Sequence, residues 1–321
     1  MTSSYYLAIG ILSIIVSITS VTTNSLILVV IIKNPLRCLR KPSSGFLCVL
    51  AVADLAVGLL SSVGVAVNCL DAFLTANLEE ETLQKYSLVA GVLTYTFQVL
   101  VVVALTLERL LAILCPVFHR NRMSFESAVV SSLVLLAYSL FFSLIQFAGV
   151  NPEVYNISDV LLHHLLPLVA VLVAYFAIHR GLKKQSRAAN TNTADSRRVQ
   201  IERRLIGTVS VVGLFMVLTL VPYLVVILLS FYCASCDGNL LLKAKFLSIL
   251  VLYSNSAIHP FIYGLRLSPY TKSFKAVFVT SPVESSHSTE MRRVTRDRRD
   301  FDRSLEIPET KTSKCTNKNT Y

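Results

Sequence analysis

Seven long apolar stretches divide this chain, and their length restricts the folds that are open to it. They cover residues 7–32, 44–70, 86–114, 125–150, 160–178, 205–232 and 246–265. An α-helix needs about 20 mostly apolar residues to cross a hydrocarbon layer of ~30 Å, whereas a helix of a soluble protein is usually polar on one face. We therefore predict an all-α integral membrane protein, with a seven-transmembrane helix bundle over residues 7–265.

The signs of the charges in the connecting loops indicate how the chain is oriented. Lys and Arg crowd the first, third and fifth loops, as in segment 180–204, whereas the second and fourth loops are acidic. Short loops rich in Lys and Arg stay in the cytoplasm. We predict a multi-pass plasma-membrane protein with a short extracellular N-terminus over residues 1–6 and a cytoplasmic C-terminus. The net charge of +11 follows from these inner loops, which suit anionic membrane lipids, and indicates no nucleic-acid partner.

The segment after the last apolar stretch divides into two parts. Ser268 and Pro269 are typical of a helix start, and apolar residues then recur at helical spacing opposite Lys272 and Lys275. This pattern predicts a short amphipathic eighth helix on the inner membrane surface, over residues 266–279. Residues 280–321 are polar, charged and rich in Ser and Thr, which predicts a disordered cytoplasmic tail.

Two features of the even loops suit an extracellular location. Asn156 begins the only Asn-X-Ser/Thr triplet of the chain, so it is a candidate glycosylation site, although a random triplet is the alternative. Cys233 and Cys236 lie three residues apart in the sixth loop, where a disulfide would persist. We predict a bridge between them, with two free thiols as the alternative. Further ligands of suitable type are missing nearby, so we expect no metal site there.

Ionisable residues at membrane depth are costly and therefore invite a functional interpretation. Asp54 lies in the middle of the second stretch and needs polar partners, for which the candidates are Asn24, Asn255, Ser256 and His259. Such a cluster could bind a small cation or a water network. The alternative is a polar network that only joins the helices.

A second charged group lies at the inner end of the third stretch. Arg109 could pair with Glu108, with Glu202 at the start of the sixth helix, or with both. One such pair has a gross Coulomb energy of ~4 kcal/mol at ~4 Å, which is enough to bias a two-state arrangement of helices. The alternative is an interfacial pair whose side chains reach water. Pro167, Pro222 and Pro260 should bend the fifth, sixth and seventh helices.

Together these residues resemble the rhodopsin-like (class A) family of G-protein-coupled receptors over residues 7–278. The matching residues are Asn24, 50–54, Glu108 with Arg109, Pro167 with Tyr175, Pro222, and 255–263, in which Pro260 and Tyr263 follow His259. The chain departs from the family in having no Trp and no Cys in the fourth loop. Gln98 stands at a position that is often Ser in the family's sodium site, which disfavours sodium at Asp54. The cysteine pattern is most similar to the melanocortin, adenosine and lysophospholipid receptor cluster.

The resemblance implies a receptor, with no cofactor and no enzymatic activity, that activates a heterotrimeric G protein. The sixth helix would pivot outward near Pro222 as Arg109 separates from Glu202, and Arg109, Tyr175 and Tyr263 would then meet the G protein. Arrestin and receptor kinases would act on the tail, where the candidate phosphorylation sites are Ser285, Ser286, Ser288 and Thr289.

Family position implies an outer ligand pocket formed by four residues, which are Tyr95, His163, Tyr223 and Tyr253. The alternative is that these side chains pack only against one another. We expect no fixed charge in this pocket, which slightly favours a neutral or lipid-like ligand; small-molecule, lipid and peptide ligands all stay open. Two other functions also stay open: a seven-helix transporter or channel, which needs a polar path across the membrane, and a receptor-like protein without coupling, which the missing Trp would suit.

Overall fold

The computed structural model describes residues 2–75, 81–188, 193–233 and 235–278, and the side chains of residues 4–75, 85–183, 204–233 and 235–278. Within these ranges seven helical segments are long and apolar enough to cross a membrane, which confirms the predicted all-α seven-helix bundle. They are Ser4–Lys33, Pro42–Thr75, Lys85–Leu114, Phe125–Ala148, Pro152–Lys183, Arg204–Tyr232 and Gly238–Arg266. The predicted tail over residues 280–321 lies outside the described residues.

Several of these spans are built from more than one helical element. The first span lies in α1 (Thr2–Lys33). The second comprises α2 (Pro42–Ala56), the π-helical turn η1 (Val57–Ser62) and α3 (Val63–Thr75). The third span lies in α4 (Glu81–Leu114), and the short helix α5 (Pro116–Arg122) follows it. The fourth comprises α6 (Phe125–Ile145) and the 3-10 turn η2 (Gln146–Ala148). The fifth span comprises α7 (Pro152–Asp159), the π-helical turn η3 (Val160–Leu165) and part of α8 (Leu166–Ala188). The sixth span lies in α9 (Thr193–Tyr232), and the seventh is α10 (Gly238–Arg266). The helix α11 (Ser268–Phe278) follows.

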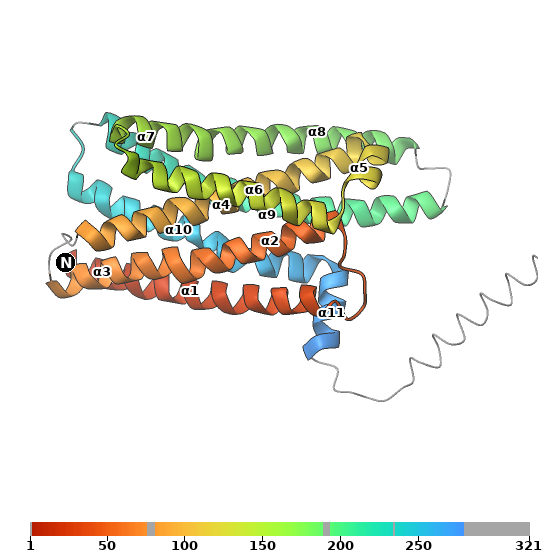
Figure 1. Cartoon of the computed structure of the whole chain (residues 1–321), viewed down its shortest axis with the longest axis horizontal. Coiled ribbons are helices and arrows are strands. Elements are labelled where there is room, and N and C mark those ends of the chain that lie inside the picture. The colour runs from red at the N-terminus through yellow and green to blue at the C-terminus, as the bar shows by residue number, and fades with distance from the viewer. Residues whose placement is uncertain (1, 76–80, 189–192, 234, 279–321) are drawn as a thin grey trace, which may run out of the picture. The chain divides into compact units, whose positions relative to one another are not determined.

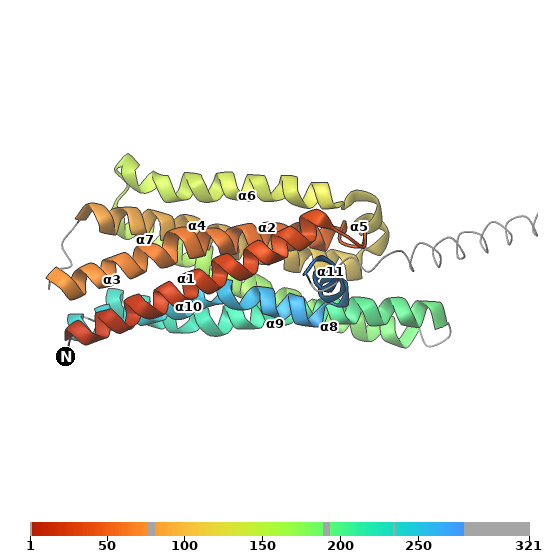
Figure 2. The same ribbon diagram turned by 90° about the horizontal axis from the view of Figure 1, so that it is seen from below.

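The long helices lie side by side, as Figure 1 and the turned view in Figure 2 both show. The N-terminus, α7 and the link between α9 and α10 lie at one end of the bundle, and α5 and α11 lie at the other (Figure 1). We call these the outer end and the inner end, after the orientation that the loop charges predict. The third loop, which contains α5, and α7, which follows the fourth span, thus lie at opposite ends, as the alternation of charge predicts.

Two helices begin much further toward the outer end than their apolar stretches indicate. The fifth span begins at Pro152 and the seventh at Gly238, about two turns before the predicted starts at residues 160 and 246. Side-chain caps explain both starts: Asn151 Oδ1 accepts from the backbone N–H of Glu153 at 2.8 Å, and Asp237 Oδ1 accepts from that of Asn239 at 2.9 Å. Polar turns thus join the helices. Asn156 consequently lies exposed on α7 and not in a loop, and its glycosylation stays a prediction.

The bundle is polar at some helix contacts and apolar on its outside. On α1, Ser17 Oγ donates to the carbonyl oxygen of Gly58 and Ser20 Oγ donates to that of Asp54, each over 2.8 Å. Hydrogen bonds of this kind join transmembrane helices. Large apolar side chains instead point outward around the bundle, among them Ile18, Val134, Phe176, Leu218 and Phe261. Such a surface needs an apolar solvent, as a bilayer supplies.

The helix α11 crosses the inner end of the bundle close to where α1 ends (Figures 1 and 2). Its Tyr270 is buried against the bundle, with its ring centroid 6.1 Å from that of Tyr263 on α10. Burial raises the pKa of Tyr270, so its phenol stays neutral at physiological pH. Part of the apolar face that predicted a membrane-surface helix therefore contacts protein, and Phe274 and Val277 also pack against the core.

Candidate functional site

A cavity of about 740 Å³ lies at the outer end of the bundle, between α3, α4, the α7–η3 segment, α9 and α10. Its volume falls within the ~300–1,000 Å³ range of small-molecule sites. Three of the four predicted ligand residues line it, and each comes from a different helix: Tyr95 from α4, Tyr223 from α9 and Tyr253 from α10. The structure therefore brings these three tyrosines together around one space.

The fourth predicted ligand residue, His163, does not line this cavity. Its Nε2 lies 3.0 Å from the hydroxyl of Tyr138 on α6, and its Nδ1 lies 2.9 Å from Asp159 Oδ1. Its ring also packs edge-on against Phe142, at 4.3 Å between centroids. His163 therefore joins the fifth span to α6, and the next residue along the chain lines the cavity instead.

That neighbour is His164, which the sequence analysis did not single out. Its ring lies between two of the cavity tyrosines, stacked at 5.0 Å from the ring of Tyr95 and at 5.1 Å from that of Tyr223. Both His163 and His164 belong to η3 and are almost fully buried. A π-helical turn changes which side chains face inward and is frequent at functional sites. No sequence signal marked this turn in advance.

The side chain of Tyr253 depends on the small size of Gly91. A Cβ atom at residue 91 would lie 2.8 Å from the hydroxyl oxygen of Tyr253, and no other atom would lie within 4 Å of it. Glycine at this position on α4 therefore makes room for the Tyr253 hydroxyl beside the cavity. Any larger residue there would displace it.

The expectation that the outer pocket has no fixed charge is wrong. Lys85, Asp159 and Lys245 are among the residues that line the cavity. Each lies one residue before an apolar stretch that was predicted to begin at residue 86, 160 or 246. Because the helices continue outward beyond those points, the charged residues become part of the cavity wall instead of the loops.

A buried polar network surrounds Asp54 in the middle of the bundle. The Asp54 side chain is fully buried, and its carboxylate accepts a hydrogen bond from Gln98 Nε2 on α4. Gln98 Nε2 also lies 2.9 Å from Ser256 Oγ on α10. His259 Nδ1 lies 3.1 Å and 3.3 Å from the two oxygens of Asp54. The network thus joins the second, third and seventh spans.

Two further predicted members lie at the edge of this network. Asn24 Nδ2 donates to the carbonyl oxygens of Ser20 and Ser256, each over 2.9 Å, and so links α1 to α10. Asn255 points elsewhere: its Nδ2 donates to Thr219 Oγ1 on α9. Of the predicted cluster, the structure therefore brings Ser256 and His259 into the network of Asp54, and it adds Gln98. Asn24 is linked to the network only through Ser20 and Ser256.

The groups around Asp54 do not fit a sodium ion. Hard cations take oxygen ligands, whereas the two Asp54 oxygens face nitrogen atoms of Gln98 and His259. Among the described residues no three His, Cys, Asp or Glu side chains are grouped as a metal site. The network therefore matches the alternative in which polar residues join helices.

At the inner end, the predicted pair of Glu108 and Arg109 forms and is almost fully buried. Arg109 Nε donates to Glu108 Oε2 over 2.5 Å, and a second guanidinium nitrogen contacts Oε1. His119 on α5 is an unpredicted third member, with Nε2 2.6 Å from Glu108 Oε1. The side chain of Glu202, the other predicted partner of Arg109, lies outside the described residues. Glu108 therefore connects the end of α4 to α5.

A close contact joins α8 to α9 above this pair. The hydroxyl of Tyr175 donates to the carbonyl oxygen of Val209 over 2.5 Å. A Cβ atom on Gly213 would collide with the Tyr175 ring, so glycine permits this approach. Tyr263 is fully buried on α10, and its hydroxyl lies 3.4 Å from Asn24 Oδ1.

Two of the three prolines predicted to bend helices lie inside a helix, between the two ends, whereas Pro167 is the second residue of α8, directly after η3. Pro222 is inside α9, next to the cavity residue Tyr223, and Pro260 is inside α10, next to His259. Each removes one backbone hydrogen bond from its helix. Both helices therefore have a weak point between the cavity and the inner end.

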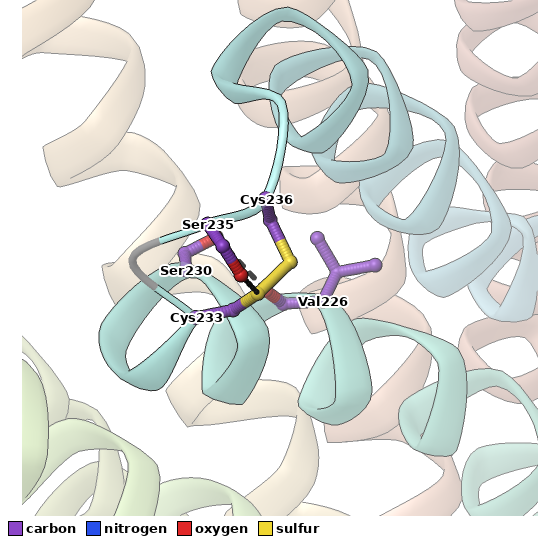
Figure 3. Close-up of a disulfide and its surroundings, with 5 residues drawn as sticks. All are labelled: Val226, Ser230, Cys233, Ser235 and Cys236. Atoms are coloured by element: carbon purple, nitrogen blue, oxygen red, sulfur yellow. Dashed lines mark hydrogen bonds between the residues drawn. A yellow bond between two sulfur atoms is a disulfide. The ribbon is translucent and has the colours of Figure 1, made fainter.

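A disulfide joins Cys233 to Cys236 at the outer end, with 5.5 Å between the Cα atoms. Figure 3 shows that it connects the end of α9 to the segment that leads into α10. Ser230 Oγ donates to the carbonyl oxygen of Val226 over 2.8 Å beneath it. The bridge thus restricts the separation of the two helices that carry Tyr223 and Tyr253.

Comparisons with known proteins give relatives for both sequence and fold. The model of the family described as 7 transmembrane receptor (rhodopsin family) matches residues 23–156 and 149–263. Neuropeptide Y receptor type 4 of Rattus norvegicus is 30% identical over 130 residues, which make up 40% of this chain and 34% of that receptor. The same receptor of Mus musculus is 27% identical over 130 residues, with the same shares of 40% and 34%. The match thus spans about a third of the length of these relatives.

The fold is similar to that of squid rhodopsin. The crystal structure of that protein matches 96% of this chain and 93% of its own, with a TM-score of 0.73 and 18% sequence identity. At this identity the likeness concerns the fold alone. The similarity to the melanocortin, adenosine and lysophospholipid receptor cluster stays a prediction, because the match to neuropeptide Y receptors does not determine a subgroup.

Proposed function

Because the chain belongs to the rhodopsin family of seven-transmembrane receptors, we propose that it binds an extracellular ligand in the outer cavity and activates a heterotrimeric G protein at its inner end. It would do so in the plasma membrane, with its N-terminus outside and its C-terminus in the cytoplasm. The basic inner loops suit an acidic partner surface and anionic lipid headgroups.

One observation supports this proposal above the others: α9 reaches both candidate sites. Its Tyr223 lines the cavity, and its Val209 accepts the hydrogen bond from Tyr175 near the inner end. The 14 residues between them correspond to about 21 Å of helix. Pro222 lies between these contacts. A ligand that displaces the outer part of α9 can therefore change the position of its inner part.

The proposed mechanism is a shift between two arrangements of the same bundle. In one, α9 is held by Tyr175, and Arg109 is paired with Glu108. In the other, α9 pivots outward near Pro222, and Arg109, Tyr175 and Tyr263 become available to the G protein. Moving such an equilibrium from 1:99 to 99:1 needs about 5.5 kcal/mol of differential binding. Arrestin and receptor kinases would act on residues 280–321.

A panel of G-protein activation assays tests this proposal through constitutive activity, which requires no ligand. The wild type is expected to activate at least one G protein, and Arg109→Ala is expected to abolish that signal. Arg122→Ala is the matched control, because Arg122 is exposed on α5 and its substitution removes the same charge at the same end of the bundle. Equal signals from the wild type and Arg109→Ala would contradict the mechanism. Ion currents without any G-protein signal would favour a channel, and silence in both assays would favour lost coupling.

A further inference from the structure

The charges that line the outer cavity are unequal in sign. Among the residues whose side chains the structure describes, two lysines, Lys85 and Lys245, and one acid, Asp159, lie in its wall. Asp159 already has a partner, because its Oδ1 lies 2.9 Å from His163 Nδ1 and His163 lies outside the cavity wall. One oxygen of Asp159 is thus already engaged within the protein.

Lys245 is the residue best placed to bind an anion. It lies on α10 among apolar residues of the same wall, which are Leu242, Phe246, Ile249 and Leu252. Its side chain is half-buried, and within the described part of the chain its ammonium group has no hydrogen bond and no ion pair. A partly desolvated ammonium without a partner is costly. A negatively charged ligand group would supply that partner.

Two further donors in the wall are also without partners. The hydroxyl groups of Tyr95 and Tyr155 are buried and make no hydrogen bond within the described residues. Both tyrosines line the cavity, and both are less than a tenth exposed. Buried hydroxyl groups are usually satisfied. A ligand that carries oxygen acceptors would satisfy them.

The rest of the wall suits an apolar body. The rings of Tyr95, His164 and Tyr223 form an aromatic stack in the wall, and aliphatic side chains cover much of the remainder. The volume of about 740 Å³ corresponds to a drug-sized molecule.

We propose that the outer cavity binds a small amphiphile whose anionic head, a carboxylate or a phosphate, pairs with the Lys245 ammonium and whose apolar body lies against the aromatic stack. This inference rests on the proposed function only in taking the cavity as the ligand site. A cationic ligand would be repelled by the Lys245 ammonium, and the one acid among the described residues of the cavity wall, Asp159, already contacts His163. A neutral ligand would leave Lys245 unpaired.

The test uses the full-length protein in nanodiscs of phosphatidylcholine. Four probes are compared: oleate, oleoyl lysophosphatidate, oleyl alcohol and oleylamine, with affinity measured from the rise in unfolding temperature. At least one of the two anionic probes is expected to bind about tenfold or more tightly than the alcohol and the amine, because only an anionic head forms a charge-assisted hydrogen bond with the ammonium. Their comparison with each other decides between a carboxylate and a phosphate head. Equal binding of the neutral or cationic probe would overturn the proposal.

Matched lysine variants connect the effect to one side chain. Lys245→Gln is expected to weaken the anionic probe about tenfold or more, and Lys245→Arg, which retains the charge, should stay within a few-fold of the wild type. Lys243→Gln is the control, because it removes the same charge two residues away on α10 and Lys243 does not line the cavity. Equal losses in Lys243→Gln and Lys245→Gln would contradict the proposal. If Lys245→Gln does not fold, the probe series and Lys245→Arg decide.

The experiments distinguish a wrong ligand class from a wrong receptor function. Arg109-dependent G-protein activation without binding of any anionic probe would refute this ligand class and leave the receptor function standing. Probe binding that depends on Lys245, without activation of any G protein, would support the ligand class and refute the coupling.

Discussion

Nδ1 of His259 on α10 lies 3.1 Å from one carboxylate oxygen of Asp54 on α2 and 3.3 Å from the other. Together with Gln98, it places nitrogen atoms against both oxygens of a fully buried carboxylate. The position beside the acid is thus filled by the protein's own side chains. In this chain the polar network joins three helices, and side-chain nitrogen atoms occupy the positions against the carboxylate oxygens.

This arrangement predicts a protein whose stability does not respond to sodium. The unfolding temperature is expected to be the same in sodium chloride and in potassium chloride at equal concentration. The double variant Gln98→Ser with His259→Asn replaces a large amide and an imidazole with a hydroxyl and a smaller amide, which opens space beside Asp54 and supplies oxygen atoms there. Sodium is expected to stabilise this variant selectively. Selective stabilisation of the wild type by sodium would contradict our account of the Asp54 site.

The contact between His119 and Glu108 predicts a role for α5 in the basal state. Removing the imidazole in His119→Ala takes away one of the groups that hold the Glu108 carboxylate, at a cost of ~1.5–3 kcal/mol for a hydrogen bond to a charged group. Because Glu108 also binds Arg109, we expect Arg109 to be released more readily and constitutive G-protein activation to rise about tenfold. Arg120→Ala, an exposed change on the same helix, should leave the signal unchanged. A lower or unchanged signal in His119→Ala would contradict the proposal that His119 and Glu108 together hold Arg109 in the basal state.

Two glycines on α9 give a paired prediction about helix packing. Gly213→Ala is expected to destabilise the protein by about 1–3 kcal/mol, because the added methyl group collides with the Tyr175 ring in a tight contact. Gly207→Ala meets no atom within 4 Å and should be neutral or stabilising by up to about 1 kcal/mol, since alanine favours the helix. Thermal unfolding of the two variants measures the difference. Equal changes in unfolding temperature for Gly213→Ala and Gly207→Ala would show that α8 and α9 are not tightly packed at Gly213.

The disulfide should contribute modestly to stability at the outer end. It closes a loop of only three sequence steps, for which loop-closure entropy gives about 2 kcal/mol. The double variant Cys233→Ser with Cys236→Ser is expected to unfold at a lower temperature than the wild type. Reductant is expected to lower the unfolding temperature of the wild type and to leave that of the double variant unchanged. Cys115→Ser changes an exposed free thiol and serves as the control. Unchanged stability after reduction would show that the bridge is dispensable.

The sequence predicted the bundle well because transmembrane helices are defined by apolar length, which can be read directly. It also located Asp54, Glu108 and Arg109, because charges at membrane depth are rare enough to stand out. The charges of the cavity were missed for a related reason: Lys85, Asp159 and Lys245 ended the apolar stretches and so were assigned to loops. Capped helix extensions at Asn151 and Asp237 put such residues inside the fold.

The remaining misses come from tertiary structure and from helix register. The exchange of His163 for His164 in the cavity wall depends on the π-helical turn η3, which no residue pattern marked. The partners Gln98 and His119 come from other parts of the fold, 44 and 11 residues away from Asp54 and Glu108. Only the packed bundle brings such pairs together.

The central claim is that the inner end of α9 moves when a G protein binds. Spin labels at Arg204→Cys on α9 and Arg122→Cys on α5, both exposed positions, measure the distance between them in a background without other free thiols. The account predicts a distance that lengthens by several ångströms on addition of a nucleotide-free G protein, and that does not change in the Arg109→Ala background. A G protein that binds the wild type while the distance stays constant would contradict the account.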